Sequence, residues 1–155
     1  IISILLFSTY VFAAGSDSSS DSSVSDPYKD AKNLVKRAGK LEKKDKIDKA
    51  KKLYAQAFKK LEKAYSSDKN NPDILNYMGY TSRKIGNFDQ AEKFYLSGLN
   101  IKPDHNGINE YLGELYVQTN RIDKAKERLE VLKSCNCEEF KELELIIKTR
   151  GTKIY

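Results

Sequence analysis

Residues 75–103 read LNYMGYTSRKIGNFDQAEKFYLSGLNIKP, and residues 109–137 read NEYLGELYVQTNRIDKAKERLEVLKSCNC. The second stretch echoes the first at a constant offset in residue number, because 109 − 75 = 34. Four residue types recur at this offset: Tyr77 as Tyr111, Gly79 as Gly113, Asp89 as Asp123 and Ala91 as Ala125. A fixed period of this size is typical of stacked helical hairpins, so the sequence predicts an all-α repeat fold.

The recurring spacing within each repeat points to a family. The pattern Leu75-x-x-Met78-Gly79, followed by Ala91-x-x-x-Tyr95, resembles the tetratricopeptide repeat (TPR), and the second stretch carries the same pattern. The resemblance implies a right-handed superhelix of hairpins whose first helices line a concave groove. It also implies that the groove holds a peptide or a partner helix, so that the protein binds rather than catalyses.

Helical periodicity divides the chain into hairpins. We expect a TPR-like solenoid of about three helix pairs plus a closing helix: a degenerate extended hairpin over 28–66, repeats over 72–102 and 106–133, and a capping helix over 137–149. The step in residue number from Ala50 to Ala91 is 41, which is 34 + 7. Seven residues are about two helical turns, so the second helix of the first hairpin should be longer by that amount.

Local signals predict where the helices begin and end. Gly86 is expected to stop a helix in the left-handed conformation. Asn71 precedes Pro72 as a cap before a proline at the first helical position. The other expected N-caps are Asp45, Asn120, and Asn87 with Gln90 in a capping box.

The first residues do not read as part of the domain. Residues 1–14 are an apolar stretch ending in Val-Phe-Ala-Ala, shorter than the roughly 20 residues that span a bilayer. They are expected to be a signal peptide that is truncated at its N-terminus. Residues 15–27 are expected to be a disordered linker rich in Ser and Asp. The prediction is an exported protein, periplasmic or secreted, and an envelope role follows by resemblance to exported TPR proteins.

Basic charge is concentrated in one segment. Residues 29–63 contain 14 Lys or Arg and 5 Asp or Glu, so their net charge is 14 − 5 = +9, against +6 for the whole chain. One interpretation is a surface for a membrane or an anionic polymer, with Lys49, Lys51 and Lys52 as its centre. The other is an ordinary solvated face on two lysine-rich helices. Nucleic acid is not expected as a partner, because arginine, the main base-reading residue, is scarce.

The resemblance also assigns groove positions. In the first repeat they are Asn76, Tyr80, Arg83 and Lys84, and in the second they are Glu110, Glu114, Val117 and Gln118. Spacings of four and seven place each set on one helix face. Arg83 offers a fork for a carboxylate, while the two glutamates favour basic groups. The alternative is that these are ordinary solvated positions. The Lys and Asn clamp that some family members use for a C-terminal carboxylate does not match this chain.

Cys135 and Cys137 are the other local feature. In an exported protein they suggest a disulfide that tightens the turn before the closing helix. Free thiols and soft-metal binding remain alternatives, and with them a small thiol redox or metal-handling protein. Two thiolates are half of a typical metal site, and the lone His105 lies in a predicted loop well before them in the chain.

Catalytic motifs are not found in the sequence. It has one His, and no phosphate-binding loop, nucleophile elbow or H-E-x-x-H motif. Glu138, Glu139 and their neighbour Glu142 are interpreted as acids that start a helix. We therefore expect no enzyme activity and no cofactor. The leading hypothesis is a scaffold that binds a protein or peptide.

Overall fold

The structure is a computed structural model that describes residues 26–150. Within this range the chain is all α-helix: α1 Pro27–Glu42, α2 Ile47–Ser67, α3 Pro72–Lys84, α4 Phe88–Ile101, α5 Asn106–Gln118, α6 Ile122–Leu132 and α7 Glu138–Lys148. The predicted signal peptide over 1–14 and nearly all of the predicted linker over 15–27 lie outside the described residues.

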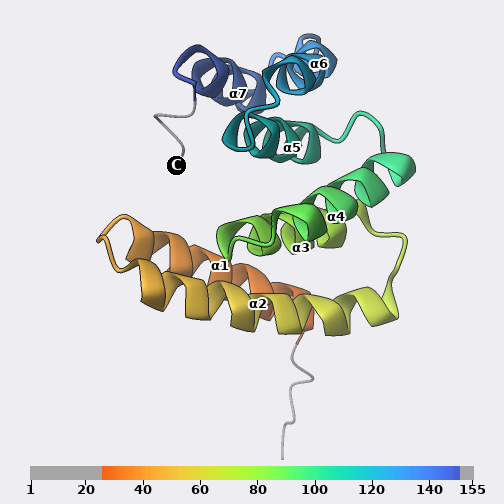
Figure 1. Cartoon of the computed structure of the whole chain (residues 1–155). Coiled ribbons are helices and arrows are strands. Elements are labelled where there is room, and N and C mark those ends of the chain that lie inside the picture. The colour runs from red at the N-terminus through yellow and green to blue at the C-terminus, as the bar shows by residue number, and fades with distance from the viewer. Residues whose placement is uncertain (1–25, 151–155) are drawn as a thin grey trace, which may run out of the picture.

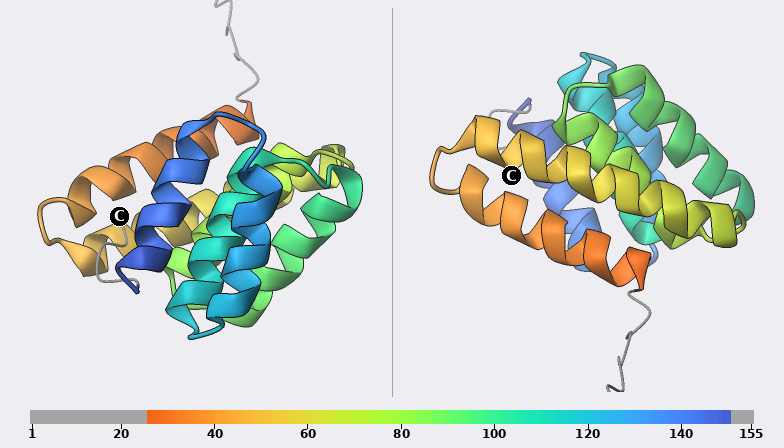
Figure 2. Two further views of the ribbon diagram at one scale, coloured as in Figure 1. Left: turned by 90° about the horizontal axis from the view of Figure 1, so that it is seen from above. Right: turned by 90° about the horizontal axis from the view of Figure 1, so that it is seen from below.

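The helices form a stack of hairpins, as the repeat in the sequence predicts. Helices α1 and α2 pair at one end, α3 and α4 follow, and α5 with α6 comes next (Figure 1). Helix α7 packs on α5 and α6 as a cap, and seen from below α1 and α2 lie side by side at the opposite end (Figure 2). The predicted arrangement of three pairs and a closing helix is therefore confirmed.

The first hairpin is elongated in its second helix. Helix α2 has 21 residues and α4 has 14, a difference of seven. The C-caps of the two helices, Asp68 and Lys102, differ in residue number by 102 − 68 = 34, whereas Ala50 and Ala91 near their starts differ by 91 − 50 = 41. The two extra turns therefore lie inside α2, and the expected insertion is confirmed.

Each hairpin turn contains one residue in the left-handed backbone conformation, at an equivalent position. Gly86 has φ +95°, and Asp45 and Asn120 have φ 55° and 59°. Their spacings are 86 − 45 = 41 and 120 − 86 = 34, the same steps as the helices. Asp and Asn adopt the left-handed region more readily than other residues with a side chain. Repeats without the glycine thus make the same turn with a small polar residue.

Two cap assignments are corrected by this geometry. Asp45 and Asn120 occupy the left-handed turn, so the N-caps of α2 and α6 are Lys46 and Arg121, and neither makes a capping hydrogen bond through its side chain. Asn87 is the N-cap of α4, but its side chain makes no capping bond either, so the predicted capping box with Gln90 is wrong. These three helix starts depend on tertiary packing.

Side chains cap the starts of α1, α3 and α5, the last of these through His105. Asn71 Oδ1 accepts hydrogen bonds from the N–H groups of Asp73 and Ile74 at 3.0 and 3.3 Å, as the sequence predicts. Asp26 Oδ1 accepts from the N–H groups of Tyr28 and Lys29. Helix α1 therefore begins at Pro27. The expected linker boundary at residue 27 is too late, because Asp26 already belongs to the helix start.

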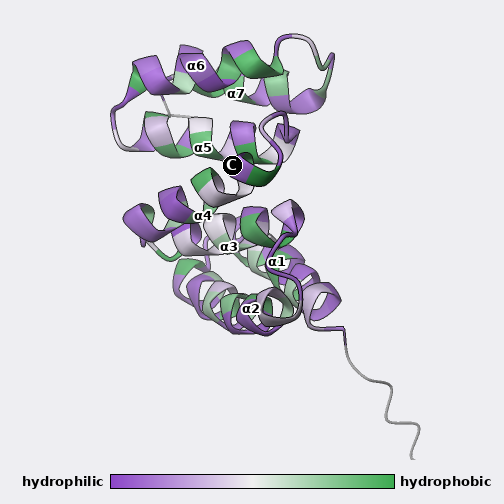
Figure 3. Cartoon of the chain, turned by 90° about the vertical axis from the view of Figure 1, so that its right-hand side faces the viewer, coloured by the Kyte–Doolittle hydropathy of each residue, from purple (hydrophilic) through white to green (hydrophobic). Residues whose placement is uncertain are grey.

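Small residues let neighbouring helices approach closely. A Cβ added to Gly79 would lie 2.5 Å from the ring of Tyr95 on α4, and one added to Gly113 would lie 2.5 Å from Leu143 on α7. Neither neighbour can move freely, because both are fully buried. Buried hydrophobic clusters follow one another along the stack, and hydrophilic and hydrophobic segments alternate along α2 and α6 (Figure 3). No helix between residues 26 and 150 has both the length and the hydropathy to cross a bilayer.

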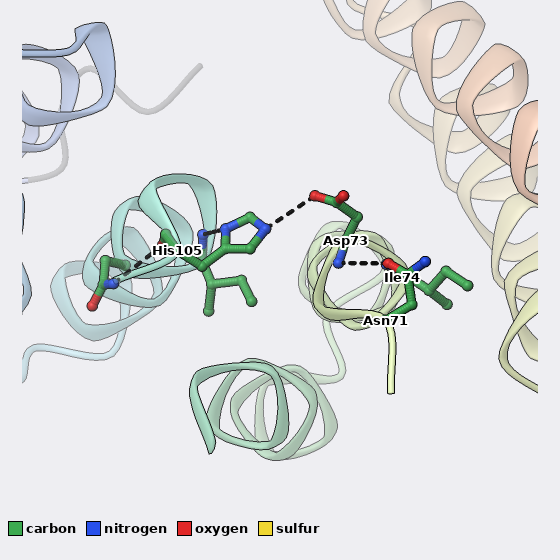
Figure 4. Close-up of polar contacts among 6 residues, drawn as sticks. Asn71, Asp73, Ile74 and His105 are labelled. Atoms are coloured by element: carbon green, nitrogen blue, oxygen red, sulfur yellow. Dashed lines mark hydrogen bonds and ion pairs between the residues drawn. The ribbon is translucent and has the colours of Figure 1, made fainter. Parts of the chain in front are cut away.

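His105 lies in the loop before α5, as predicted, and is also the N-cap of that helix. Its Nδ1 accepts a hydrogen bond from the N–H of Ile108 at 3.2 Å, and its Nε2 lies 3.0 Å from Asp73 Oδ1 at the start of α3 (Figure 4). Because Nδ1 accepts, the neutral ring carries its proton on Nε2 and donates it to Asp73. The imidazole of His105 thus caps α5 and also contacts the start of α3 in the previous hairpin.

Replacing His105 by alanine is expected to lower the free energy of unfolding by about 1 kcal/mol, because the N-cap acceptor is lost. His105→Asn is the matched control, since asparagine can cap the helix but is too short to reach Asp73. Urea denaturation of both variants measures the difference. If the asparagine variant is as unstable as the alanine variant, the contact with Asp73 accounts for the loss and the cap does not.

Candidate functional site: a polar pocket on the first-helix face

A pocket of about 510 Å³ lies among the first helices of the hairpins and the capping helix. Residues of α1, α3, α5 and α7 line it, with Ile47 at the start of α2. Tyr80 and Tyr111 supply aromatic walls. Its charged side chains are Glu42, Lys43, Arg83, Lys84, Glu110, Glu114 and Glu142.

Most of the predicted groove positions line this pocket. Tyr80, Arg83, Lys84, Glu110 and Glu114 all do. A role of these residues in binding stays a prediction. Three of them are not ordinary solvated positions, because Arg83, Glu110 and Glu114 are only 3%, 3% and 4% exposed.

Three other predicted positions lie elsewhere. Asn76 is buried, and a Cβ added to Gly107 would lie 3.0 Å from its amide nitrogen, so Asn76 packs against the start of α5. Val117 belongs to the hydrophobic core, and Gln118 is exposed outside the pocket lining. The family resemblance and helical spacing gave the right face, but packing buries Asn76 and Val117, and Gln118 lies outside the pocket.

Arg83 is paired inside the protein. Its Nη2 lies 2.6 Å from Glu114 Oε2, with side-chain exposures of 2% and 6%. The guanidinium also lies over the rings of Tyr80 and Tyr111, at 5.7 and 5.8 Å from their centroids. Burial raises the pKa of Glu114, and the neighbouring Arg83 charge opposes that rise. Arg83 is therefore not the open fork for a ligand carboxylate that the sequence suggested.

Lys84 links three helices at the other side of the pocket. Its Nζ lies 2.8 Å from Glu42 Oε2, and the hydroxyl of Tyr54 donates to the same oxygen at 2.9 Å. The ammonium also lies over the rings of Tyr54 and Tyr80. These contacts connect α1, α2 and α3, so Lys84 is held in place on the pocket wall.

Glu110 has an acidic environment. Burial, a hydrogen bond with Glu142 and the charges of Glu114, Glu142 and Glu139 raise the pKa of Glu110 to about 10. The Glu110 carboxyl is therefore protonated at neutral pH. The structure thus places a neutral acid, hydrogen-bonded to a second carboxyl group, in the pocket wall.

Sequence reasoning did not predict several pocket residues, among them Tyr111, Glu142 and Glu42. Tyr111 belongs to the repeat in the sequence, but there it serves only as a repeat marker. Glu142 follows the acids that begin the last helix, and Glu42 carries no local pattern at all. Only the meeting of α1, α5 and α7 in space identifies Glu42 and Glu142 as pocket residues.

Cys135 and Cys137 form a disulfide in the turn between α6 and α7. Their Cα atoms are 5.1 Å apart, and Asn136 between them has φ 49°. Glu138 and Glu139 follow in the first turn of α7, as expected of acids that start a helix. Neither cysteine lines the pocket. Over residues 26–150, no group of three or more His, Cys, Asp or Glu side chains is arranged to hold a metal ion.

The basic segment forms two lysine rows. Lys49, Lys51 and Lys52 are exposed on α2, as the surface hypothesis requires. Exposed lysines recur at steps of three, four or seven along one face of each helix, which is the spacing of a single stripe. The α1 row is Lys29, Lys32, Lys36, Lys40 and, at the C-cap, Lys43. The α2 row is Lys49, Lys52, Lys59 and Lys63, with the exposed Lys51 beside it.

The sequence and the fold of this chain are similar to those of several known proteins. The tetratricopeptide repeat family matches residues 49–108. The human protein O-mannosyl-transferase TMTC3 is 31% identical over 71 residues, which are 46% of this chain and 8% of that protein. This chain therefore spans a small part of that relative.

Two solved structures share the fold. PcrH, in complex with the chaperone binding region of PopD, is 13% identical with a TM-score of 0.51, over 77% of this chain and 89% of that one. The Sgt2 TPR domain from Aspergillus fumigatus is 18% identical with a TM-score of 0.50, over 81% and 85%. At these identities the likeness concerns the fold alone.

Proposed function

Because this chain belongs to the tetratricopeptide repeat family, we propose that it binds a peptide or a segment of a partner protein in the pocket between α1, α3, α5 and α7. The observation that carries this proposal is the pocket itself. It is open enough to hold several side chains and is lined by aromatic rings and polar groups from every first helix. Aromatic walls with a few fixed polar groups are typical of binding sites.

Family and neighbours support binding as the mode of action. Proteins of this family are generally non-catalytic interaction modules, and PcrH was solved with a segment of PopD. On this proposal the chain is not an enzyme, and the similarity to a mannosyl-transferase covers only 8% of that protein. The rigid pairs Arg83–Glu114 and Lys84–Glu42 keep the pocket shaped before the partner arrives, which reduces the entropy lost on binding.

The test uses two matched exposed hydrophobic residues. Ile47 lines the pocket and is 42% exposed, whereas Leu96 is 43% exposed and lies outside the pocket lining. A photo-crosslinking residue at each position, in the native compartment, should give a discrete adduct at Ile47 and none at Leu96. The captured partner is then purified for titration. Ile47→Glu should weaken its binding at least tenfold, roughly 1.4 kcal/mol, and Leu96→Glu should leave it unchanged. Equal effects at both positions contradict the proposal.

The compartment is also a proposal. The apolar run 1–14 followed by Ser-rich sequence supports export, so we place the scaffold in the periplasm or outside the cell, in the assembly of a bacterial envelope. Cell fractionation of the tagged full-length protein tests this. Recovery of the intact, unprocessed chain in the cytoplasm contradicts it.

A second candidate function uses the lysine rows of α1 and α2, for which we propose contact with an anionic membrane or polymer. Two exposed rows on adjacent helices of one hairpin favour an electrostatic and reversible contact. Neutralising Lys49, Lys51 and Lys52 with glutamine should reduce binding to vesicles rich in acidic lipid, and binding should weaken as salt screens the charges. Salt-insensitive binding, or none in wild type, excludes this role.

A further inference from the structure

The charged groups of the pocket do not balance. Four carboxyl groups and three cationic groups line it. Glu114 is paired with Arg83 and Glu42 with Lys84, while Lys43 is exposed. Glu110 and Glu142 remain, and each has the other as its hydrogen-bonding neighbour. The pocket therefore contains one place where two carboxyl groups meet without a cation.

Glu110 is buried and directed into the pocket. It is 3% exposed and lines the pocket wall. Among the residues that the structure describes, its hydrogen-bonding neighbour is another acid and no cation is paired with it. A carboxyl group in this setting lacks the cation with which buried acids are ordinarily paired. A ligand that carries a positive charge and N–H donors would supply it.

The neighbours of Glu110 make this position selective for a cation. Glu139 and Glu142 face it from α7, Glu114 and Tyr111 from α5, and Tyr80, Arg83 and Lys84 line the pocket wall on α3. On the other packed helices, Glu92 of α4 bonds to Arg121, and Arg128 of α6 bonds to Asn109. The local excess is thus negative, and an acidic ligand group would be repelled.

We infer that the partner segment proposed above contributes a lysine or arginine side chain, which binds between the carboxyl groups of Glu110 and Glu142 beside the ring of Tyr111. This inference rests on the proposed function and names the chemistry that the pocket selects. On binding, the proton of Glu110 leaves to solvent, and both carboxylates accept charge-assisted hydrogen bonds from the cation. The ring of Tyr111 adds a face on which the aliphatic part of the side chain can pack.

Because binding of the cation releases a proton, its affinity should depend on pH, which binding by shape complementarity alone would not. The pKa of Glu110 is about 10, so the free protein carries this proton at neutral pH. A cation that displaces it binds more tightly as pH rises, by at most tenfold per pH unit because one proton is released. A neutral side chain in the same space would show no such dependence.

The experiment uses four pools of ten-residue peptides with acetylated and amidated ends. The flanks are degenerate, and the central residue is lysine, arginine, norleucine or glutamate. Carboxyl-carbon NMR of the folded chain reports on Glu110 and Glu142, and ring signals report on Tyr80 and Tyr111. The lysine and arginine pools should shift both carboxyl carbons, with an affinity that rises between pH 6 and pH 8. The other pools should not.

Two variants test whether peptide binding depends on the carboxyl group of Glu110 or on a general change in the fold. Glu110→Gln keeps a hydrogen-bonding side chain and should weaken the lysine pool about tenfold or more and abolish its pH dependence. Glu144→Gln, on the same helix as Glu142 and paired with Lys148, should behave like wild type. If the norleucine or glutamate pool shifts the tyrosine rings as strongly as the lysine pool, the inference is overturned and the groove function stands. If no pool shifts any pocket residue, the proposed function itself fails.

Discussion

Replacing Arg83 by methionine is expected to lower the free energy of unfolding by about 3–5 kcal/mol, because it leaves the buried carboxyl of Glu114 without its cation. The pair is separated by 2.6 Å and is almost inaccessible to water. Methionine fills much of the space between Tyr80 and Tyr111, so the loss reports on charge rather than on a cavity. Removal of Arg83 also lets the pKa of Glu114 rise further. The penalty should therefore be smaller at pH 5, where the carboxyl is more readily protonated, than at pH 8.

Denaturant titration measures this effect, and two further variants interpret it. Arg83→Met combined with Glu114→Leu should recover most of the lost stability, because apolar side chains often replace a buried ion pair without net loss. Arg121→Met breaks an ion pair with Glu92 that is 33% and 20% exposed, and it should cost less than Arg83→Met because water screens the remaining charge. If the single Arg83 variant is as stable as the double variant, Glu114 finds another partner and the argument is wrong.

Replacing Glu110 by glutamine is expected to stabilise the fold progressively as pH rises. The pKa of Glu110 is about 10 in the folded chain and about 4.5 as an ordinary value. Between these values the folded chain binds one more proton than the unfolded chain. Wild-type stability therefore falls with rising pH, by at most about 1.4 kcal/mol per pH unit. Glutamine does not titrate, so the variant lacks this contribution, and its advantage over wild type should be small near pH 5 and largest above pH 7.

Urea denaturation at pH 5, 6, 7 and 8 gives the slope for each protein. Glu110→Met is the control for packing, because it also removes the titrating group but cannot hydrogen-bond to Glu142. Both variants should show the same reduced slope, with different stabilities at every pH. A slope equal to that of wild type in either variant would show that Glu110 ionises in the folded chain as it does in the unfolded one.

Several elements of the fold could be predicted because they depend on short-range chemistry. Asn71 before Pro72 starts α3, and Gly86 ends its hairpin turn, since each acts on its near neighbours along the chain. The extra turns of α2 follow from the longer step between the first two repeats. The caps at Asp45 and Asn120 were wrong for a related reason. Asp and Asn suit both an N-cap and a left-handed turn, and only the packed hairpin selects between them.

The candidate site was predicted less completely. The family resemblance, supported by helical spacing, placed Tyr80, Lys84 and Glu110 on the face that lines the pocket. It could not show that Arg83 is buried, because burial of that face depends on α5 and not on α3. It also overlooked Glu142, since no regular spacing connects the capping helix to the repeats.

The number of hairpins, their register and the face of each first helix can be read from the chain alone, because a 34-residue period and local helix signals are properties of neighbours in sequence. Which charges meet depends on the tertiary structure. Arg83 and Glu114 come from α3 and α5, and Glu110 and Glu142 come from α5 and α7. The stacking of helices brings both pairs within bonding distance and removes water from them. That burial turns one pair into a fixed ion pair and the other into a pair of acids that holds a proton.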